Sequence, residues 1–145
     1  TMLLDSQLLF SDAQAITADA ASTNIVDLGI ARNIFDGEPM AVVLTVDVAA
    51  DGTTTDETYE FQIETDDNAS FSSATDLLVH SIGYASLTAG SQHILPIPVG
   101  AAVEQYMRVY YNVGGTTPSI TVTAFLMPLA MVSKRKVYAD AITIS

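Results

Sequence analysis

The sequence predicts an all-β fold, an antiparallel β-sandwich with extended N-terminal and C-terminal arms. Apolar residues recur with a period of two along several runs, clusters of turn-forming residues separate these runs, and helical periodicity is scarce. The 145 residues suit a single domain spanning 1–145. A jelly roll is favoured over an immunoglobulin-like sandwich, although periodicity alone does not distinguish the two folds.

Four runs carry the clearest strand signals. In one of them Phe61 and Ile63 alternate with Glu60 and Gln62, which predicts a strand with one buried and one wet face. The last two runs are separated by the sequence GGTTP, which predicts a hairpin between them. The four runs are 42–48, 59–65, 107–113 and 120–125. The residues expected to share one core are Val42, Leu44, Val46, Phe61, Ile63, Val109, Tyr111 and Val122.

Three further runs give weaker strand signals, at 25–29, 77–82 and 92–97. Pro96 and Pro98 lack the backbone N–H that a central strand must donate, so the run 92–97 is expected to lie at a sheet edge or to end at these prolines. With the two ends of the chain, these runs bring the expected number of strands to about eight to ten, as in a sandwich or barrel.

The two ends of the chain fall outside the regular pattern. Residues 1–16 form the N-terminal arm, and residues 129–145 form a C-terminal arm or an added strand. Each end is either a strand of the same domain or an extension that docks on a neighbouring molecule. On the second alternative, the interface residues are the apolar Met2, Leu3, Leu4, Leu8 and Phe10 and the C-terminal Lys134, Arg135, Lys136 and Tyr138.

The charge of the chain limits its partners. Against 17 acidic residues stand 5 lysines and arginines, for a net charge of −12. Phosphate backbones and anionic lipids repel such a protein, so neither nucleic acid nor a membrane is expected as a partner. Hydrophobic residues make up 49% of the chain, which indicates a folded domain with apolar surface to bury against other chains, including copies of itself as a dimer or trimer.

The basic residues are unevenly placed. Residues 1–133 hold only Arg32 and Arg108, whereas the short stretch 134–136 holds the other three. A basic cluster on an acidic protein is expected to pair with an acidic neighbour. No apolar run is long enough for a membrane-spanning helix, and the N-terminus lacks the basic start of a secretory signal, so we expect no export through a signal peptide.

The sequence offers little for catalysis, and no enzymatic activity and no cofactor are expected. Cysteine is absent, which excludes disulfides, thiolate nucleophiles and thiolate zinc sites. His80 and His93 are the only histidines, and neither is accompanied by a GxSxG nucleophile motif. We interpret both as surface or boundary residues. A hydrolase would need a pocket that gathers one of them with carboxylates.

Acidic turns supply the main alternative. Asp51, Asp56 and Glu57 lie in one turn, and the stretch 64–68 contains further carboxylates. Oxygen atoms from two such loops could hold calcium, although their spacing matches no EF-hand loop. The alternative function is therefore a calcium- or carbohydrate-binding β-sandwich adhesion module.

Three stretches resemble the capsid cement (decoration) proteins of tailed bacteriophages. The N-terminal stretch MLLDSQLLFSDAQAITADAASTNIVDLG is similar to the segment that leads into the jelly roll of these proteins. The stretch QIETDDNASFSSATDLL, residues 62–78, is similar to a recurrent strand and acidic turn of phage structural proteins. The stretch QYMRVYYNVGGTTPSITVTAFL, from Gln105, is similar to the strands near the C-terminus of the family.

This resemblance implies a structural virion protein on the outer surface of the capsid. Such a protein binds the major capsid protein and bridges neighbouring subunits, which stabilises the shell. The quoted stretches contain no catalytic motif, so the resemblance transfers no site residues to this chain.

Overall fold

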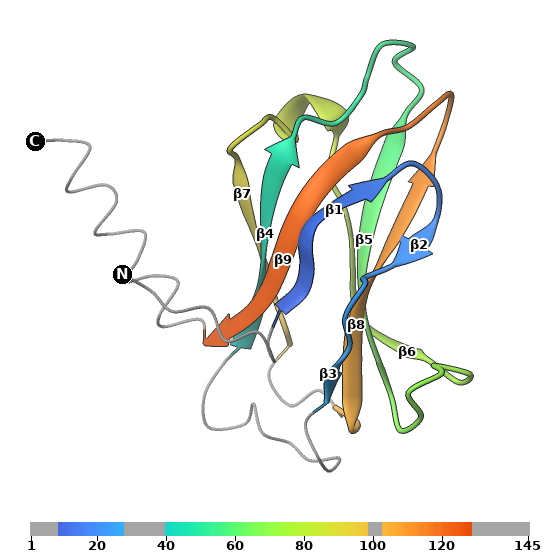
Figure 1. Cartoon of the computed structure of the whole chain (residues 1–145), viewed down its shortest axis with the longest axis vertical. Helices are drawn as coiled ribbons and strands as arrows, with labels where there is room; N and C mark the ends of the chain where they lie inside the picture. The colour runs from blue at the N-terminus through green and yellow to red at the C-terminus, as the bar shows by residue number, and fades with distance from the viewer. Residues whose placement is uncertain (1–8, 28–39, 99–102, 129–145) are drawn as a thin grey trace, which may run out of the picture.

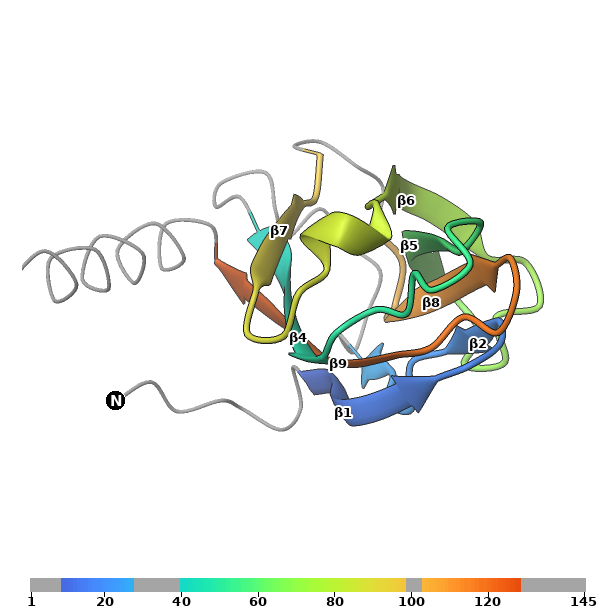
Figure 2. The same ribbon diagram turned by 90° about the horizontal axis from the view of Figure 1, so that it is seen from above.

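The computed structural model describes residues 9–27, 40–98 and 103–128. Within these residues, nine strands form two antiparallel sheets that pack face to face, which confirms the predicted all-β sandwich (Figures 1 and 2). The strands are β1 (Leu9–Ile16), β2 (Ala20–Ala21), β3 (Val26–Asp27), β4 (Met40–Val48), β5 (Thr58–Asp66), β6 (Thr75–Ser81), β7 (Gln92–Pro96), β8 (Tyr106–Gly114) and β9 (Ile120–Pro128).

The strand order is that of a jelly roll. Sheet A has the order β1-β9-β4-β7, and sheet B has the order β2-β8-β5-β6, with β3 also paired to β8. The short strands β2 and β3 both pair with β8 and together take the place of one strand. This gives two four-stranded sheets between which the chain repeatedly crosses, as in a jelly roll and unlike the immunoglobulin order. As the prolines predict, β7 lies at an edge of sheet A.

The predicted hairpin around GGTTP is wrong. The strands on either side of it do not pair, because β8 belongs to sheet B and β9 to sheet A, and the turn carries the chain across the sandwich. Gly115, with φ +90°, supplies the left-handed backbone of this turn. Both strands have one apolar face toward the common core, and a period of two does not reveal which neighbour a strand pairs with.

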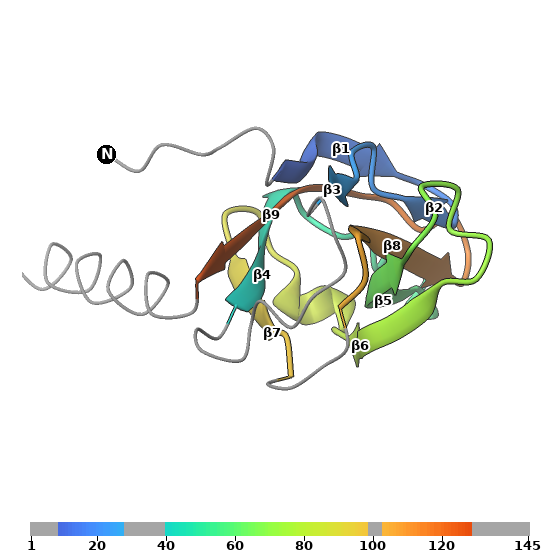
Figure 3. The same cartoon turned by 90° about the horizontal axis from the view of Figure 1, so that it is seen from below.

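The two sheets face each other (Figure 3), and the core is formed by the side chains of both that point into the space between them. All eight residues predicted for the core are buried there. At its centre the rings of Phe61 and Tyr111 meet edge to face, with their centroids 5.9 Å apart. The Tyr111 hydroxyl is satisfied by Ser11 Oγ at 2.7 Å, which joins sheet B to β1 of sheet A. The ring pair joins the neighbouring strands β5 and β8 within sheet B, and the hydrogen bond to Ser11 is the contact of Tyr111 that crosses between the layers.

The described part of the N-terminal arm is a strand of the sandwich, one of the two alternatives expected for it. Residues 9–16 form β1, an integral strand of sheet A, and Phe10 is fully buried in the core. The rest of this arm and the whole of 129–145 lie outside the described residues. In the part of the chain that is described, no helix is long and apolar enough to cross a membrane.

Candidate functional site

Sheet A carries apolar residues on its outer face as well as on its core face. Val43 lies opposite Phe125 on one side and Ile94 on the other, and Phe125 lies opposite Leu9. Residues directly opposite each other in an antiparallel pair point to the same face, so these four residues form a row across the whole sheet. Together with Met127 they make a cluster separate from the main core, called here the outer cluster.

The outer cluster arises from strands that are apolar at every position. In β4, Val42 and Leu44 point into the core, so Val43 between them must point outward. Val43 is nonetheless only 1% exposed and Phe125 only 4% exposed, because the members of the cluster pack on one another. Val43 and Phe125 are therefore already covered in the folded chain, and within the cluster the half-buried Leu9 and Ile94 are the side chains that another chain could reach. The outer cluster was not predicted, although apolar residues at both odd and even positions of 40–46 and 124–127 are a sequence signal for it.

The outer face of sheet B is polar and charged. Glu60, Gln62 and Glu64 of β5 lie there beside Arg108 and Tyr110 of β8. Arg108 Nε donates to Glu64 Oε1 at 2.7 Å. The Arg108 guanidinium also stands 4.3 Å from the centroid of the Phe71 ring, a cation–π contact that fixes the loop after β5 against the sheet.

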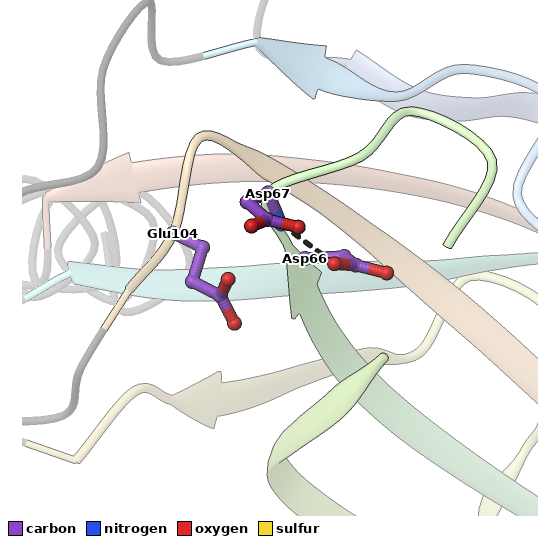
Figure 4. A group of neighbouring side chains, drawn as sticks. All are labelled: Asp66, Asp67 and Glu104. Atoms are coloured by element: carbon purple, nitrogen blue, oxygen red, sulfur yellow. Dashed lines mark hydrogen bonds between the residues drawn. The ribbon is translucent and has the colours of Figure 1, made fainter. Parts of the chain in front are cut away.

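An acidic group lies at the end of β5. Asp66, Asp67 and Glu104 each place a carboxylate oxygen within 4.8 Å of the others (Figure 4). Thr65 positions Glu104, since its hydroxyl accepts from the Glu104 N–H and donates to the Tyr106 carbonyl, both at 2.8 Å. Such a group could hold a cation such as calcium, which prefers oxygen ligands. Asp66 and Asp67 belong to a predicted acidic turn, whereas Glu104 was missed because it is distant in sequence.

Asp66 also has a local structural role. Its carboxylate accepts hydrogen bonds from the Asp67 N–H at 2.7 Å and the Ser73 N–H at 2.8 Å, which close the loop 67–73. Hydrogen bonds to the charged form, chiefly the one from Ser73, hold the pKa of Asp66 below its usual value. The ionised carboxylate is therefore already engaged with the backbone.

The second acidic turn does not gather its carboxylates. Asp51 accepts from the N–H and hydroxyl of Thr53, and Asp56 accepts from Thr54 and Thr116. These hydrogen bonds lower the pKa of both aspartates, with the side-chain bonds from Thr53 and Thr54 contributing most. Glu57 is buried, and its Oε2 has no hydrogen-bond partner among the described residues. The turn uses Asp51 and Asp56 to fix its own backbone.

The histidines lie on two edge strands. His80 is exposed on β6, in agreement with the prediction, and His93 is half-buried on β7. His93 Nε2 lies 3.1 Å from Ser91 Oγ. Burial lowers the pKa of His93 below its usual value, a hydrogen bond to the Ser86 backbone opposes this, and the nearby His80 lowers it further. Within the described residues His93 has no carboxylate partner of the kind that orients the base of a hydrolytic triad.

Comparison with protein families places the sandwich in a known group. The sequence model of the Bbp16 family matches residues 10–126, which is most of the chain. The chain belongs to the Bbp16 family. A search of curated proteins found no match. In this Bbp16 protein the matched region runs from the first core residue of β1 into β9, and of the outer cluster it includes Val43, Ile94 and Phe125.

The predicted interface residues divide between the core and the ends of the chain. Phe10 is a core residue, so it is not free for contact with another molecule. The other eight lie outside the described residues: Met2, Leu3, Leu4, Leu8, Lys134, Arg135, Lys136 and Tyr138. These eight positions also lie outside the region that the Bbp16 family model matches.

Proposed function

We propose that this Bbp16 protein is a non-enzymatic structural protein that binds the outside of a viral capsid and bridges neighbouring major capsid subunits. The observation that carries the proposal is the outer cluster on sheet A. A two-layer sandwich needs only one apolar face per sheet. Val43 and Phe125 of the second face are covered within the chain, and its half-buried members Leu9 and Ile94, on the outer strands β1 and β7, are where another surface could make contact.

The net charge supports the same function. Most described acidic side chains are exposed or half-exposed on the sandwich, and the whole chain carries a charge of −12. A strongly anionic protein avoids nucleic acid, which suits a protein on the outside of a DNA-filled shell. The three stretches that resemble tailed-phage cement proteins point to the same location.

Binding to the assembled shell would stabilise it by mass action. A ligand that binds only the closed lattice and not free subunits shifts the equilibrium toward the lattice. Because a capsid offers many equivalent sites, and one bridging molecule contacts two subunits, each contact can be weak while the shell gains considerable stability. This mechanism requires surfaces for contact and no reactive group.

The test is binding of the purified protein to capsids of the virus that encodes it. The protein is mixed with intact capsids, and its occupancy is measured by co-sedimentation. Ile94 is a half-buried member of the outer cluster on the edge strand β7, so Ile94→Asp alters that face with little disturbance of the core. Burying a charge against an apolar partner should weaken capsid binding about tenfold or more.

Val48→Asp is the matched control for this test. Val48 is 57% exposed, lies at the end of β4 in the same sheet, and does not belong to the outer cluster. This variant should bind capsids as the native chain does. Native protein that stays in the supernatant would contradict the proposed function, and equal occupancy of native protein and the Ile94→Asp variant would show that sheet A is not the binding face.

A second candidate function is a calcium-binding adhesion module. The group of Asp66, Asp67 and Glu104 favours it, because three carboxylates approach one another at the end of β5. The test is the melting temperature with calcium and with a chelator. A large rise with calcium that is lost in Glu104→Gln would favour this second function, because ligand binding stabilises the folded state.

A further inference from the structure

The outer face of sheet B has an arrangement that the proposed capsid contact on sheet A does not use. Its central row is Tyr110, Gln62 and Val79, which lie opposite one another on β8, β5 and β6. Val79 is 46% exposed, which makes it an apolar side chain in contact with solvent. Carboxylates flank this row, with Glu60 on one side and Glu64 opposite Asp76 on the other.

Within the described residues, the carboxylates of this face outnumber the cationic side chains that could pair with them. The described residues include thirteen acidic side chains but only one lysine or arginine, Arg108. Arg108 is already engaged, since it pairs with Glu64 and stacks on Phe71. The hydrogen-bond partners of Glu60 are the uncharged Gln62, Ser81 and Asn112. Within the described residues, Glu60 and Asp76 therefore lack a salt bridge.

The edge of sheet B is also open to another strand. Among the described strands, β6 pairs only with β5, so its other edge presents backbone N–H and C=O groups to its surroundings. An extended peptide can add to such an edge through main-chain hydrogen bonds, while its side chains contact the adjoining face.

The C-terminal segment of the chain has the complementary chemistry. Residues 134–138 read Lys-Arg-Lys-Val-Tyr, three cations followed by an apolar and an aromatic residue. The cations match the carboxylates of the face, and the apolar residues match Val79 and Tyr110. The aromatic ring of Tyr110 already stands near a guanidinium, 5.5 Å from Arg108, which shows that cations are accommodated on this face.

We propose that the C-terminal segment of one copy, residues 129–145, binds along β6 and the outer face of sheet B of a second copy. The 17 residues after Pro128 reach about 55 Å when extended, which is enough to cross to a neighbour. The end of β9 lies on the side of the sandwich away from β6 in all three views (Figures 1 to 3). A segment that starts there meets the β6 of an adjacent molecule without wrapping around its own sandwich.

Charge reversal in the full-length chain tests this contact. The tail variant carries Lys134→Glu, Arg135→Glu and Lys136→Glu, and the face variant carries Glu60→Lys and Asp76→Lys. Each should associate with itself about tenfold more weakly than the native chain in sedimentation velocity at low ionic strength. The native association should also weaken as salt is added, because salt screens exposed charges.

Two rescue experiments separate direct pairing from an indirect effect. A chain that carries both sets of changes should associate again, because the charges of both partners are exchanged. A mixture of the two variants should form a heterodimer, since the normal tail of the face variant can bind the normal face of the tail variant. That mixture also distinguishes a contact between copies from a tail that folds back on its own sheet.

The control for the face variant carries Asp12→Lys and Asp47→Lys, which make the same change of net charge on strands of sheet A. It should associate as the native chain does. Three outcomes would overturn the inference. The native chain could be monomeric at all concentrations, the tail and face variants could associate as the native chain does, or the chain with both sets of changes could fail to associate. This readout involves no capsid, so its failure is distinguishable from failure of the proposed capsid binding.

Discussion

The outer faces of the two sheets differ in chemistry, although both sheets contribute to one core. Sheet A presents the outer cluster, whose members Val43 and Phe125 are nearly as buried as core residues. Sheet B presents carboxylates, Arg108 and Tyr110, which are half-exposed and linked by hydrogen bonds and one salt bridge. Binding through an apolar face depends little on salt concentration. Binding through a charged face weakens as salt is added, and its charges select the partner and align it. A small sandwich can therefore support two kinds of contact.

A substitution in the core between the sheets should have the largest effect on the free energy of unfolding, and substitutions on the two outer faces are compared with it. Phe61→Ala should lower the free energy of unfolding by about 3–5 kcal/mol, because it removes a buried ring that contacts Tyr111 and leaves a cavity. Urea denaturation followed by circular dichroism measures the change. Gln62→Ala, one residue further on the outer face, is the control and should cost about 1 kcal/mol or less. A loss below about 1 kcal/mol for Phe61 would show that this position is not part of a packed core.

Substitutions on the two outer faces address the difference itself. Phe125→Ala in the outer cluster should cost about 3 kcal/mol, close to a core substitution, since this ring is almost completely buried. Tyr110→Ala at the corresponding outer position of sheet B should cost about 1 kcal/mol, because this ring is half-exposed. Denaturant unfolding under identical conditions compares the two. Equal losses would mean that the two faces do not differ in packing.

The turn that joins the sheets should tolerate change at only one of its two glycines. Gly115→Ala should cost about 1–3 kcal/mol, because φ is +90° and an added Cβ would lie 2.4 Å from the Asp56 carbonyl oxygen. Gly114→Ala should cost less, since its added Cβ would meet only the Thr58 hydroxyl, at 2.8 Å. Thermal unfolding of both variants checks this order. The reverse order would contradict the described crossing from sheet B to sheet A.

The smallest effect concerns pH and involves the loop after β5. The pKa of Asp66 is lower in the folded than in the unfolded chain, so this group contributes stability above its unfolded pKa, about 3.9. That contribution is lost as the pH falls through the lower, folded pKa. Asp66→Asn should therefore reduce the acid dependence of the free energy of unfolding. Ser73→Ala keeps the donating backbone N–H and should retain that dependence, whereas identical curves for native chain and Asp66→Asn would exclude this role.

Alternation along single strands allowed the sequence to predict the fold class and the core. Polar residues, Glu60 and Gln62, separate the apolar residues of β5. A polar residue at every second position indicates a strand with one buried and one wet face, and this predicted β5 correctly. The same reasoning failed in β4, where Val43 is apolar as well, and the outer cluster went unnoticed. The pairing of β8 and β9 was also predicted wrongly. A short loop between two apolar runs is compatible both with a hairpin and with a crossing from one sheet to the other.

The candidate sites were harder to predict than the fold. Asp66 and Asp67 are neighbours in sequence, but Glu104 joins them only because β8 returns beside β5 and brings its preceding residue to the same end. Phe10 was assigned to an arm because its surroundings in sequence are apolar without alternation. It is a core residue because β1 pairs with β9, and no local pattern contains information on a partner more than a hundred residues away.

The pairing of β1 with β9 has a consequence for synthesis of the chain. The first strand of sheet A needs the last described strand as its neighbour, so all residues through β9 must leave the ribosome before this sheet can close. At about 5–20 residues per second, β1 waits several seconds with its apolar side chains unpaired. Folds that depend on such distant pairings also form slowly, in about milliseconds to seconds. The nascent chain is therefore most exposed to aggregation in the interval between translation of β4 and β9, when chaperone protection would have its largest effect.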